Sequence, residues 1–230
     1  MPARIFVLAG VNGAGKSSVG GAALLRNKVD YFNPDEAARS LLAGNPDLPL
    51  DAANAQAWEL GRKGLERALA QGLNFAFEST LGARTIPEML LQGARQGAQV
   101  HVWYAGLSSP QLHVQRVRAR AAAGGHDIAD AKIRERYESS RVNLVRLLPH
   151  LASLRVYDNS AEGDPKAGQR PAPVLLLHME GGRVASHIAL DKVPQWGKPI
   201  LAAALHPAPV APGGDARHTA LRKPGGPLHG

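Results

Sequence analysis

A glycine-rich octapeptide, GVNGAGKS at residues 10–17, constrains this chain more than any other segment. It follows a continuous apolar run at residues 4–9, which is typical of a strand buried on both faces of a parallel sheet. The residues after it are compatible with a helix through about Leu25. A glycine-rich turn between such a strand and a helix lets backbone N–H groups surround a phosphate. The octapeptide therefore predicts a phosphate-binding loop of the Walker A type.

The residues of this loop have separate expected roles. Lys16 reaches the β and γ oxygens of ATP, and the Ser17 hydroxyl takes a position on Mg²⁺. The N-terminus of the following helix adds its partial positive charge. The alternative, an ordinary glycine turn with a chance lysine, does not explain the strand before the loop and the helix after it. The predicted ATP-binding residues are Gly10, Asn12, Gly13, Ala14, Gly15, Lys16, Ser17 and Ser18.

Short apolar strands alternate with helices along the first 160 residues. Such alternation implies crossover connections and a five-stranded parallel sheet covered on both faces, a three-layer α/β sandwich. The expected strands are residues 4–9, 29–32, 74–77, 100–104 and 154–157. The expected helices after the first are residues 35–43, 52–70, 86–96, 110–122 and 130–148.

The last third of the chain has a different character. Two apolar runs at 174–179 and 183–188, separated by Glu180-Gly181-Gly182, predict a β-hairpin, and a short helix is expected at 199–205. Pro, Gly and His dominate residues 207–230, which predicts a disordered tail. We therefore expect one domain over residues 1–206, with a lid region at about 110–148.

Composition narrows the class of partner. The net charge of +8 and the pI of about 10.1 indicate an anionic partner, but aromatic residues make up only 5% and no long basic stripe is present. These last two features argue against nucleic acid. No apolar run is long enough to span a membrane, no signal peptide is recognisable and cysteine is absent. We expect a cytoplasmic protein.

Polar residues follow the predicted strands at their carboxyl ends, where ligands of open α/β sheets bind. Asp35 can accept the proton of an attacking hydroxyl, or it can belong to the N-terminal cap of the next helix. Glu78 can hold a magnesium-bound water or a substrate hydroxyl, or can cap a helix. Both alternatives remain open at this stage.

The predicted lid is rich in arginine, whose planar fork suits a transferring phosphoryl group. The spacing does not place all of these arginines on one face, so we expect two to act in catalysis and the others to be solvated or paired with acids. They are Arg116, Arg118, Arg120, Arg134 and Arg136. The nine histidines are scattered without the spacing of a metal site.

Six ordered blocks resemble the zeta-toxin-like P-loop kinases, in particular their compact bacterial branch of predicted ATPases. The resemblance covers about residues 4–160, and a weaker similarity is found at residues 193–196. It implies a fold like that of the nucleotide and shikimate kinases and phosphorylation of a hydroxyl on a UDP-amino-sugar or a related nucleotide or sugar, an activity that makes zeta toxins toxic. The blocks are AGVNGAGKSS (9–18), FNPDE (32–36), FAFESTL (75–81), GGHDI (124–128), RERY (134–137) and VYDNS (156–160).

The same resemblance implies roles for individual residues. Asp35 matches the catalytic base, and Lys16 and Ser17 match the ATP and magnesium residues. Arg120 and Arg136 are the preferred lid arginines, with Arg116 and Arg134 as alternatives. An antitoxin-like protein is an implied partner. The implied substrate-side residues are Asn33, Asp35, Glu78, Thr80 and Arg84.

Three other functions compete with a small-molecule kinase. A polynucleotide 5′-hydroxyl kinase would explain the basic pI and predicts binding that falls steeply with salt. A transporter-type ATPase needs an LSGGQ-like segment and a strand ending in Asp-Glu, and the sequence contains neither. A nucleotide-dependent switch with slow hydrolysis predicts that function survives replacement of Asp35.

Overall fold

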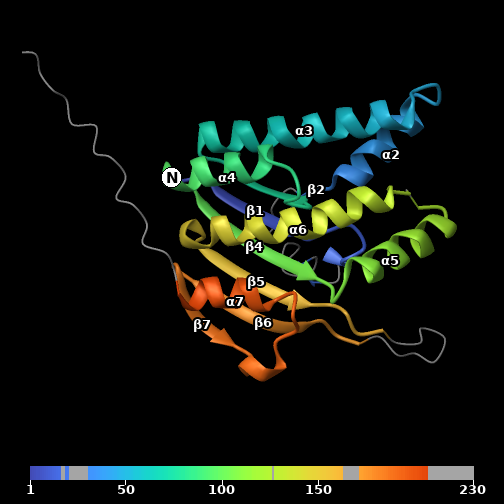
Figure 1. The fold of residues 1–230 in the computed structure, drawn as a ribbon. Helices are drawn as coiled ribbons and strands as arrows, with labels where there is room; N and C mark the ends of the chain where they lie inside the picture. Colours follow the sequence, from blue (N-terminus) through green and yellow to red (C-terminus); the bar gives the residue numbers. More distant parts are fainter. Residues whose placement is uncertain (17–18, 21–30, 126, 163–170, 207–230) are drawn as a thin grey trace, which may run out of the picture.

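The computed structural model describes residues 1–16, 19–20, 31–125, 127–162 and 171–206. Within these residues one sheet of seven strands runs through the molecule (Figure 1). The strands are β1 (Arg4–Ala9), β2 (Tyr31–Phe32), β3 (Asn74–Ser79), β4 (Gln99–Gly106), β5 (Ser153–Asp158), β6 (Val174–Glu180) and β7 (Arg183–His187). Their order across the sheet is β2-β3-β1-β4-β5-β6-β7.

The first five strands are parallel, as the sequence predicts. β1 pairs with β3 and with β4, β2 pairs with β3, and β4 pairs with β5. All five carboxyl ends therefore meet at one edge of the sheet. The second strand was expected from residue 29, but residues 29 and 30 lie outside the described residues.

The helices lie close to their predicted positions. The described α-helices are α2 (Pro34–Gly44), α3 (Leu50–Gln71), α4 (Thr85–Arg95), α5 (Pro110–Ala122), α6 (Asp130–Leu147) and α7 (Lys198–Leu205). Two 3₁₀ turns, Leu148–His150 and Leu190–Lys192, follow α6 and β7. Of the helix expected after the glycine-rich loop, residues 16, 19 and 20 are described and are helical.

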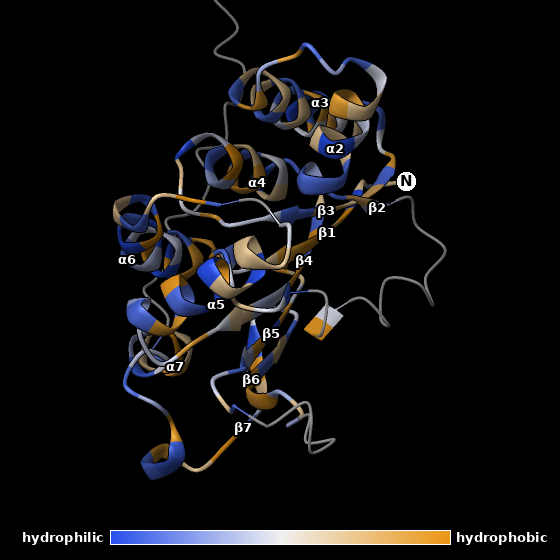
Figure 2. Cartoon of the chain, turned by 90° about the vertical axis from the view of Figure 1, so that its right-hand side faces the viewer, coloured by the Kyte–Doolittle hydropathy of each residue, from blue (hydrophilic) through white to orange (hydrophobic). Residues whose placement is uncertain are grey.

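One main core lies between the sheet and the helices on one of its faces. α3, α4, α6 and α7 contribute buried residues such as Leu65, Leu90, Leu144 and Ile200 to this core. Most of the central strand β1 is coloured as hydrophobic (Figure 2), and its residues 5–9 are buried. A smaller cluster on the other face contains Phe6, Leu8 and Trp103. Burial of both faces explains why residues 4–9 form a continuous apolar run.

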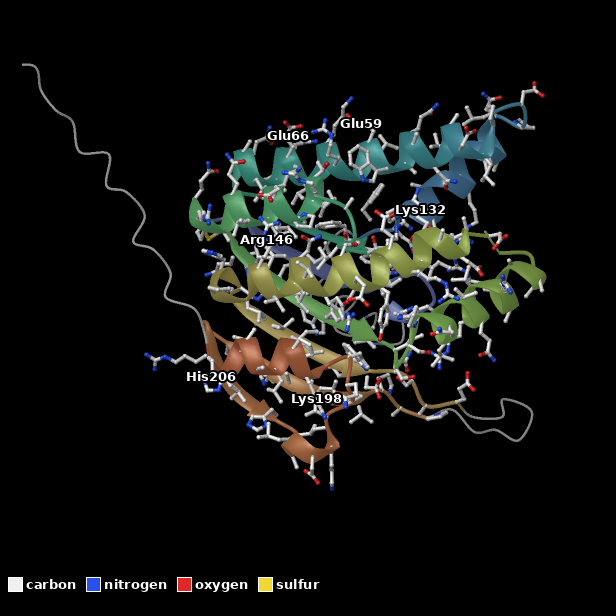
Figure 3. The ribbon with its side chains drawn as sticks, viewed as in Figure 1. Glu59, Glu66, Lys132, Arg146, Lys198 and His206 are labelled. Carbon is white, nitrogen blue, oxygen red and sulfur yellow. The ribbon has the colours of Figure 1, made fainter. Side chains whose placement is uncertain are left out.

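Helix α3 shows how the outer surface differs from the core. Glu59 and Glu66 lie on its outward side (Figure 3), and both pair with Arg62, with N–O distances of 2.7 and 3.1 Å. Such exposed pairs one turn apart contribute little to stability. In the described residues no helix is both long and apolar enough to cross a membrane.

The predicted β-hairpin is present and extends the sheet. β6 pairs with β5 in antiparallel orientation, and β7 pairs with β6. The indole N–H of Trp196, which precedes α7, donates to the Asp158 carboxylate at the end of β5, with an N–O distance of 3.1 Å. The hairpin is thus a continuation of the sheet. The predicted tail, residues 207–230, lies outside the described residues.

Candidate active site

The glycine-rich loop has a backbone that requires glycine. Gly10, Gly13 and Gly15 have φ angles of 136°, 82° and 75°, in the region that side chains rarely allow. A Cβ on Gly10 would lie 2.2 Å from the Ala105 carbonyl oxygen, and one on Gly13 would lie 2.8 Å from the His113 carbonyl oxygen. The loop can therefore curl tightly against β4 and α5 only with these glycines.

Side chains from distant parts of the chain hold the loop in this shape. Nδ1 of His113 lies 2.8 Å from the Asn12 carbonyl oxygen, which assigns the proton to Nδ1. Burial lowers the pKa of His113 to about 4, so the ring is neutral near pH 7. Nδ2 of Asn159 donates to the Ala14 carbonyl oxygen at 2.9 Å, and Arg116 donates to the Asn159 carbonyl oxygen at 2.9 Å. These bonds attach the loop to α5 and to the segment after β5.

Lys16 lies at the mouth of this loop. Its Nζ donates to the Gly10 carbonyl oxygen at 3.3 Å and lies 3.6 Å from a carboxylate oxygen of Glu78. A curled loop with a lysine at its mouth fits the phosphate groups of a nucleotide. Ser17 and Ser18, the predicted magnesium and nucleotide residues, lie outside the described residues.

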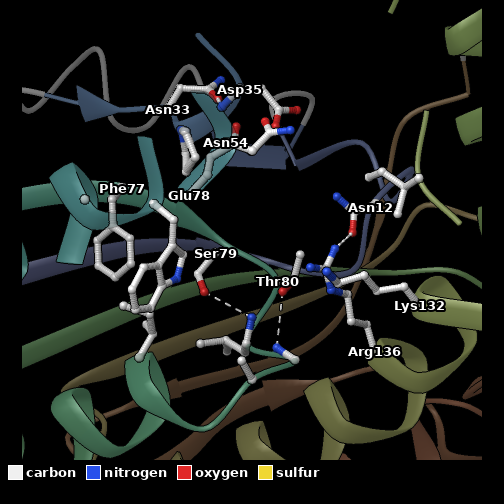
Figure 4. Close-up of a pocket in the computed structure, with 18 of the residues that line it drawn as sticks. Asn12, Asn33, Asp35, Asn54, Phe77, Glu78, Ser79, Thr80, Lys132 and Arg136 are labelled. Atoms are coloured by element: carbon white, nitrogen blue, oxygen red, sulfur yellow. Dashed lines mark hydrogen bonds between the residues drawn. The ribbon is translucent and has the colours of Figure 1, made fainter. Parts of the chain in front are cut away.

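A cavity of about 660 Å³ opens beside Lys16, between the loop, α2, α3, the segment after β3 and the start of α6. It brings together most of the side chains selected from the sequence, as Figure 4 shows. The predicted residues that line it are Asn12, Lys16, Asn33, Asp35, Glu78, Thr80 and Arg136. Its volume is in the range of small-molecule sites.

The cap of α2 is Asn33, since its side-chain oxygen accepts from the backbone N–H groups of Asp35 and Glu36 at 2.9 and 3.4 Å. Asp35 follows in the first turn, and its carboxylate is not used for capping. It lies 3.6 Å from the guanidinium of Arg120, and both side chains are about half exposed. The carboxylate is thus available to a ligand in the cavity.

The five lid arginines separate into different environments. Arg136 lines the cavity and donates to the Asn12 side-chain oxygen at 2.8 Å, and burial lowers its pKa below the ordinary value. Arg116 bonds the backbone after β5, and Arg118 pairs with Asp130 at 2.7 Å. Arg134 is exposed. The two arginines preferred from the sequence, Arg120 and Arg136, are those in contact with other predicted site residues.

The segment after β3 is held by α6. Leu81 has a φ of 53°, and its carbonyl oxygen accepts from Asn143 at 2.7 Å. Ser140 donates to the Thr80 carbonyl oxygen at 2.5 Å, and both α6 residues are buried. The Thr80 hydroxyl oxygen accepts from the Gly82 N–H at 3.2 Å. Arg84, by contrast, is exposed and is not part of the cavity lining.

Several cavity residues are not selected by the sequence analysis. Lys132 lies one helical turn before Arg136 on α6, so the spacing of the two could have indicated it. Trp58 and Asn54 come from α3, and the sequence gives no sign that this helix borders the cavity. The exposed fraction of Trp58 is 43%.

No cluster of three or more His, Asp or Glu side chains that could hold a metal occurs in the part of the chain that the structure describes. Mg²⁺ in phosphoryl-transfer sites usually binds one or two protein oxygens together with phosphates and water. The carboxylates of Asp35 and Glu78 in the cavity fit that donor chemistry.

No protein-family model matches the chain. An uncharacterised protein of Haemophilus influenzae is 29% identical over 142 residues, which cover 60% of this chain and 94% of that protein.

Solved structures with a similar fold include two of the AvrRxo1-ORF1:AvrRxo1-ORF2 complex, one with sulphate ions and one with ATP. Both have a TM-score of 0.57 and 15% identity, and they cover 84% and 93% of this chain. This chain spans 65% and 66% of the length of those chains.

A structure of the PezAT chromosomal toxin–antitoxin system of Streptococcus pneumoniae is also similar. It has a TM-score of 0.51 and 14% identity, and it covers 75% of this chain, which spans 74% of that chain. Together with the strand order and the glycine-rich loop, these likenesses confirm the predicted fold: the chain has a P-loop α/β fold like that of the AvrRxo1-ORF1:AvrRxo1-ORF2 and PezAT structures.

Proposed function

We propose that this chain is an ATP-dependent phosphotransferase that moves the γ-phosphoryl group to a hydroxyl of a small molecule. One observation carries the proposal: a single cavity contains a phosphate-loop lysine, a carboxylate that could act as a base, and a partly buried arginine. These are Lys16, Asp35 and Arg136. They are the types of residue that phosphoryl transfer requires.

ATP is the proposed donor, and Mg²⁺ is proposed to bind with it. The glycine backbone of the loop and the position of Lys16 support the first part. The presence of ATP in one AvrRxo1-ORF1:-ORF2 structure is in keeping with it. Ser17, together with the phosphates and water, would hold the metal, which supplies neutralising charge on the phosphates.

The proposed roles of the residues follow the movement of charge. Asp35 accepts the proton of the acceptor hydroxyl while the acceptor oxygen bonds to the γ-phosphorus, and the bond from that phosphorus to the bridging oxygen breaks. ADP leaves with that electron pair. Lys16 and Arg136 neutralise the negative charge that spreads over the transferred group. Arg120 must then release Asp35 when the acceptor binds.

The acceptor we propose is a UDP-amino-sugar or a related nucleotide or sugar. The cavity supports an acceptor of this size, since about 660 Å³ exceeds what a single small polyol fills. Asn33, Glu78 and Thr80 would contact its polar groups. Arg84 is not in the lining, so its proposed part would need a movement of the segment after β3.

An antitoxin-like protein is the proposed partner. Two similar structures support it: one is of the AvrRxo1-ORF1:AvrRxo1-ORF2 complex, and the other is of the PezAT toxin–antitoxin system. If the acceptor is a UDP-amino-sugar, we expect the activity to be toxic to the cell, as the resemblance implies.

The test combines purified protein, Mg-ATP and a panel of acceptors, with mass spectrometry as the readout. The panel contains UDP-sugars, free sugars, nucleosides, NAD and a short 5′-hydroxyl oligonucleotide. Addition of one phosphate to a small molecule is expected. If only the oligonucleotide gains a phosphate, the proposal is wrong and the protein is a polynucleotide kinase. Tight ATP binding without any phosphorylated product would favour a nucleotide-dependent switch.

A further inference from the structure

Glu78 connects the cavity to the phosphate loop in a way that the sequence does not suggest. One of its carboxylate oxygens lies 3.6 Å from Nζ of Lys16, and the other accepts a hydrogen bond from the hydroxyl of Tyr31. The Lys16 and Glu78 side chains are only 13% and 15% exposed. Among the ion pairs of the described residues, Lys16 takes part in this one alone.

The register of the sheet places these groups together. Tyr31 of β2 is aligned with Ala76 of β3, two residues before Glu78. Side chains two residues apart on a strand share a face, so Tyr31 and Glu78 lie on the same face of the sheet. Burial and the bond to Glu78 raise the pKa of the Tyr31 hydroxyl, so it remains protonated and donates. The tyrosine can therefore fix the direction of the carboxylate.

We propose that Tyr31 is a positioning residue that holds the Glu78 carboxylate against Lys16, where the carboxylate competes with the phosphates of ATP. Of the three side chains only Lys16 is cationic, so it is the one that the phosphate charge attracts most strongly. When the phosphates bind Lys16, Glu78 loses its cationic partner and turns to the acceptor side of the cavity, beside Thr80. Nucleotide binding thus prepares the acceptor side, which gives an ordered sequence with ATP first. The inference rests on the ATP-binding part of the proposed function.

The experiment measures the affinity of the protein for Mg²⁺ and the non-hydrolysable analogue AMP-PNP by titration calorimetry, with no acceptor present. Removal of the competing charge in Glu78→Gln should tighten binding by about three- to tenfold. Tyr31→Phe, which loosens the carboxylate, should tighten it by about two- to threefold. In the Glu78→Gln background, Tyr31→Phe should have no further effect.

A matched control separates this competition from general electrostatics. Glu36→Gln removes the same charge from an exposed position of α2, outside the cavity lining and without contact to Lys16, and should leave the affinity almost unchanged. Thermal unfolding of each variant verifies the fold.

Unchanged or weaker binding in Glu78→Gln, or an equal gain in Glu36→Gln, would overturn the competition. An undiminished effect of Tyr31→Phe in the Glu78→Gln background would overturn the role of the tyrosine. If calorimetry gives the predicted affinities but the acceptor panel gives no phosphorylated product, this inference is retained and only the proposed phosphoryl transfer is refuted. Absence of AMP-PNP binding to every variant would remove both.

Discussion

At the scale of single residues, the site depends on a carboxylate that the fold leaves free. Asn33 caps α2 with its own side chain, so the Asp35 carboxylate has no capping duty. Its ion partner in the described residues is Arg120, at 3.6 Å and half exposed, which is a weak interaction in water. A ligand can displace such a partner at low cost.

If Asp35 is the base, Asp35→Asn should lower the rate of phosphoryl transfer by about 10²–10⁴-fold, because the amide cannot accept the proton. The affinity for Mg-ATP should stay within about threefold, since Lys16 and the loop are untouched. The measurement is single-turnover transfer beside nucleotide titration. A full transfer rate in the variant would assign the base elsewhere, and an unfolded variant would give Asp35 a structural role.

His113 gives a pH-dependent prediction. Its pKa is near 6.5 in an unfolded chain and about 4 in the folded one. Between these values the unfolded state binds a proton that the folded state does not, so stability is full above pH 6.5 and falls towards pH 4. The expected loss of unfolding free energy from pH 7 to pH 5 is roughly 2 kcal/mol.

The measurement compares urea unfolding of the wild type and His113→Asn at both pH values. The asparagine amide can still donate to the Asn12 carbonyl oxygen but does not titrate, so its loss between the two pH values should be smaller by that amount. The same pH dependence in both proteins would show that His113 is not buried as a neutral ring.

The convergence of Lys16, Asp35 and Glu78 could be predicted from the sequence because each lies at, or shortly after, the carboxyl end of a strand of the parallel sheet. Lys132, Trp58 and Tyr31 could not be predicted in the same way. Their places depend on how α6, α3 and the edge strand pack against the cavity, which local sequence patterns do not determine. The N-cap of α2 could not be assigned from the sequence either, since only the hydrogen bonds distinguish Asn33 from Asp35 as the capping residue.

At the scale of secondary-structure elements, α6 joins the two sides of the site. It presents Lys132 and Arg136 to the cavity, and it bonds the segment after β3 through Ser140 and Asn143. Arg136 and Thr80, two residues of the cavity lining, are thus both attached to this helix. A movement of α6 would alter both together.

Asn143→Ala should therefore destabilise the fold by about 1–3 kcal/mol, because the Leu81 carbonyl is left buried without its donor. Arg134→Ala, at an exposed position of the same helix, serves as the control and should change the unfolding free energy by less than about 0.5 kcal/mol. Equal effects of the two substitutions, measured by denaturant unfolding, would contradict the role given to Asn143.

For the β6–β7 hairpin, the sequence predicts the two strands and the turn but not their place in the sheet. Its two strands and its Glu-Gly-Gly turn are visible in the sequence as a local pattern. β6 pairs with β5 although residues 159–173 separate the two strands in the sequence, and the sequence does not specify this pairing. The contact between Trp196 and Asp158, which secures this end of the sheet, is likewise a tertiary feature.

At the scale of the whole molecule, a five-stranded parallel sheet positions the site, and an antiparallel hairpin widens the sheet on the side of β5. The described part of the chain ends with α7, whose Ile200 and Leu201 are buried in the main core. Residues 207–230 lie outside the described residues, and the disordered tail expected there remains a prediction from composition.

Deletion of residues 207–230 should shift the melting temperature by less than about 2 °C, since little apolar surface is available there for burial. Differential scanning calorimetry of the full and shortened chains measures this shift. A decrease of more than about 5 °C would show that the tail packs on the domain.

The central claim is that the γ-phosphoryl group of ATP reaches an organic hydroxyl. The most direct test uses ATP labelled with ¹⁸O in the γ-phosphate, the acceptor panel, and the wild type beside Lys16→Ala and Asp35→Asn. We predict a small molecule with a labelled phosphate ester for the wild type and none for either variant. Labelled inorganic phosphate as the sole product, or equal product from all three proteins, would contradict the claim.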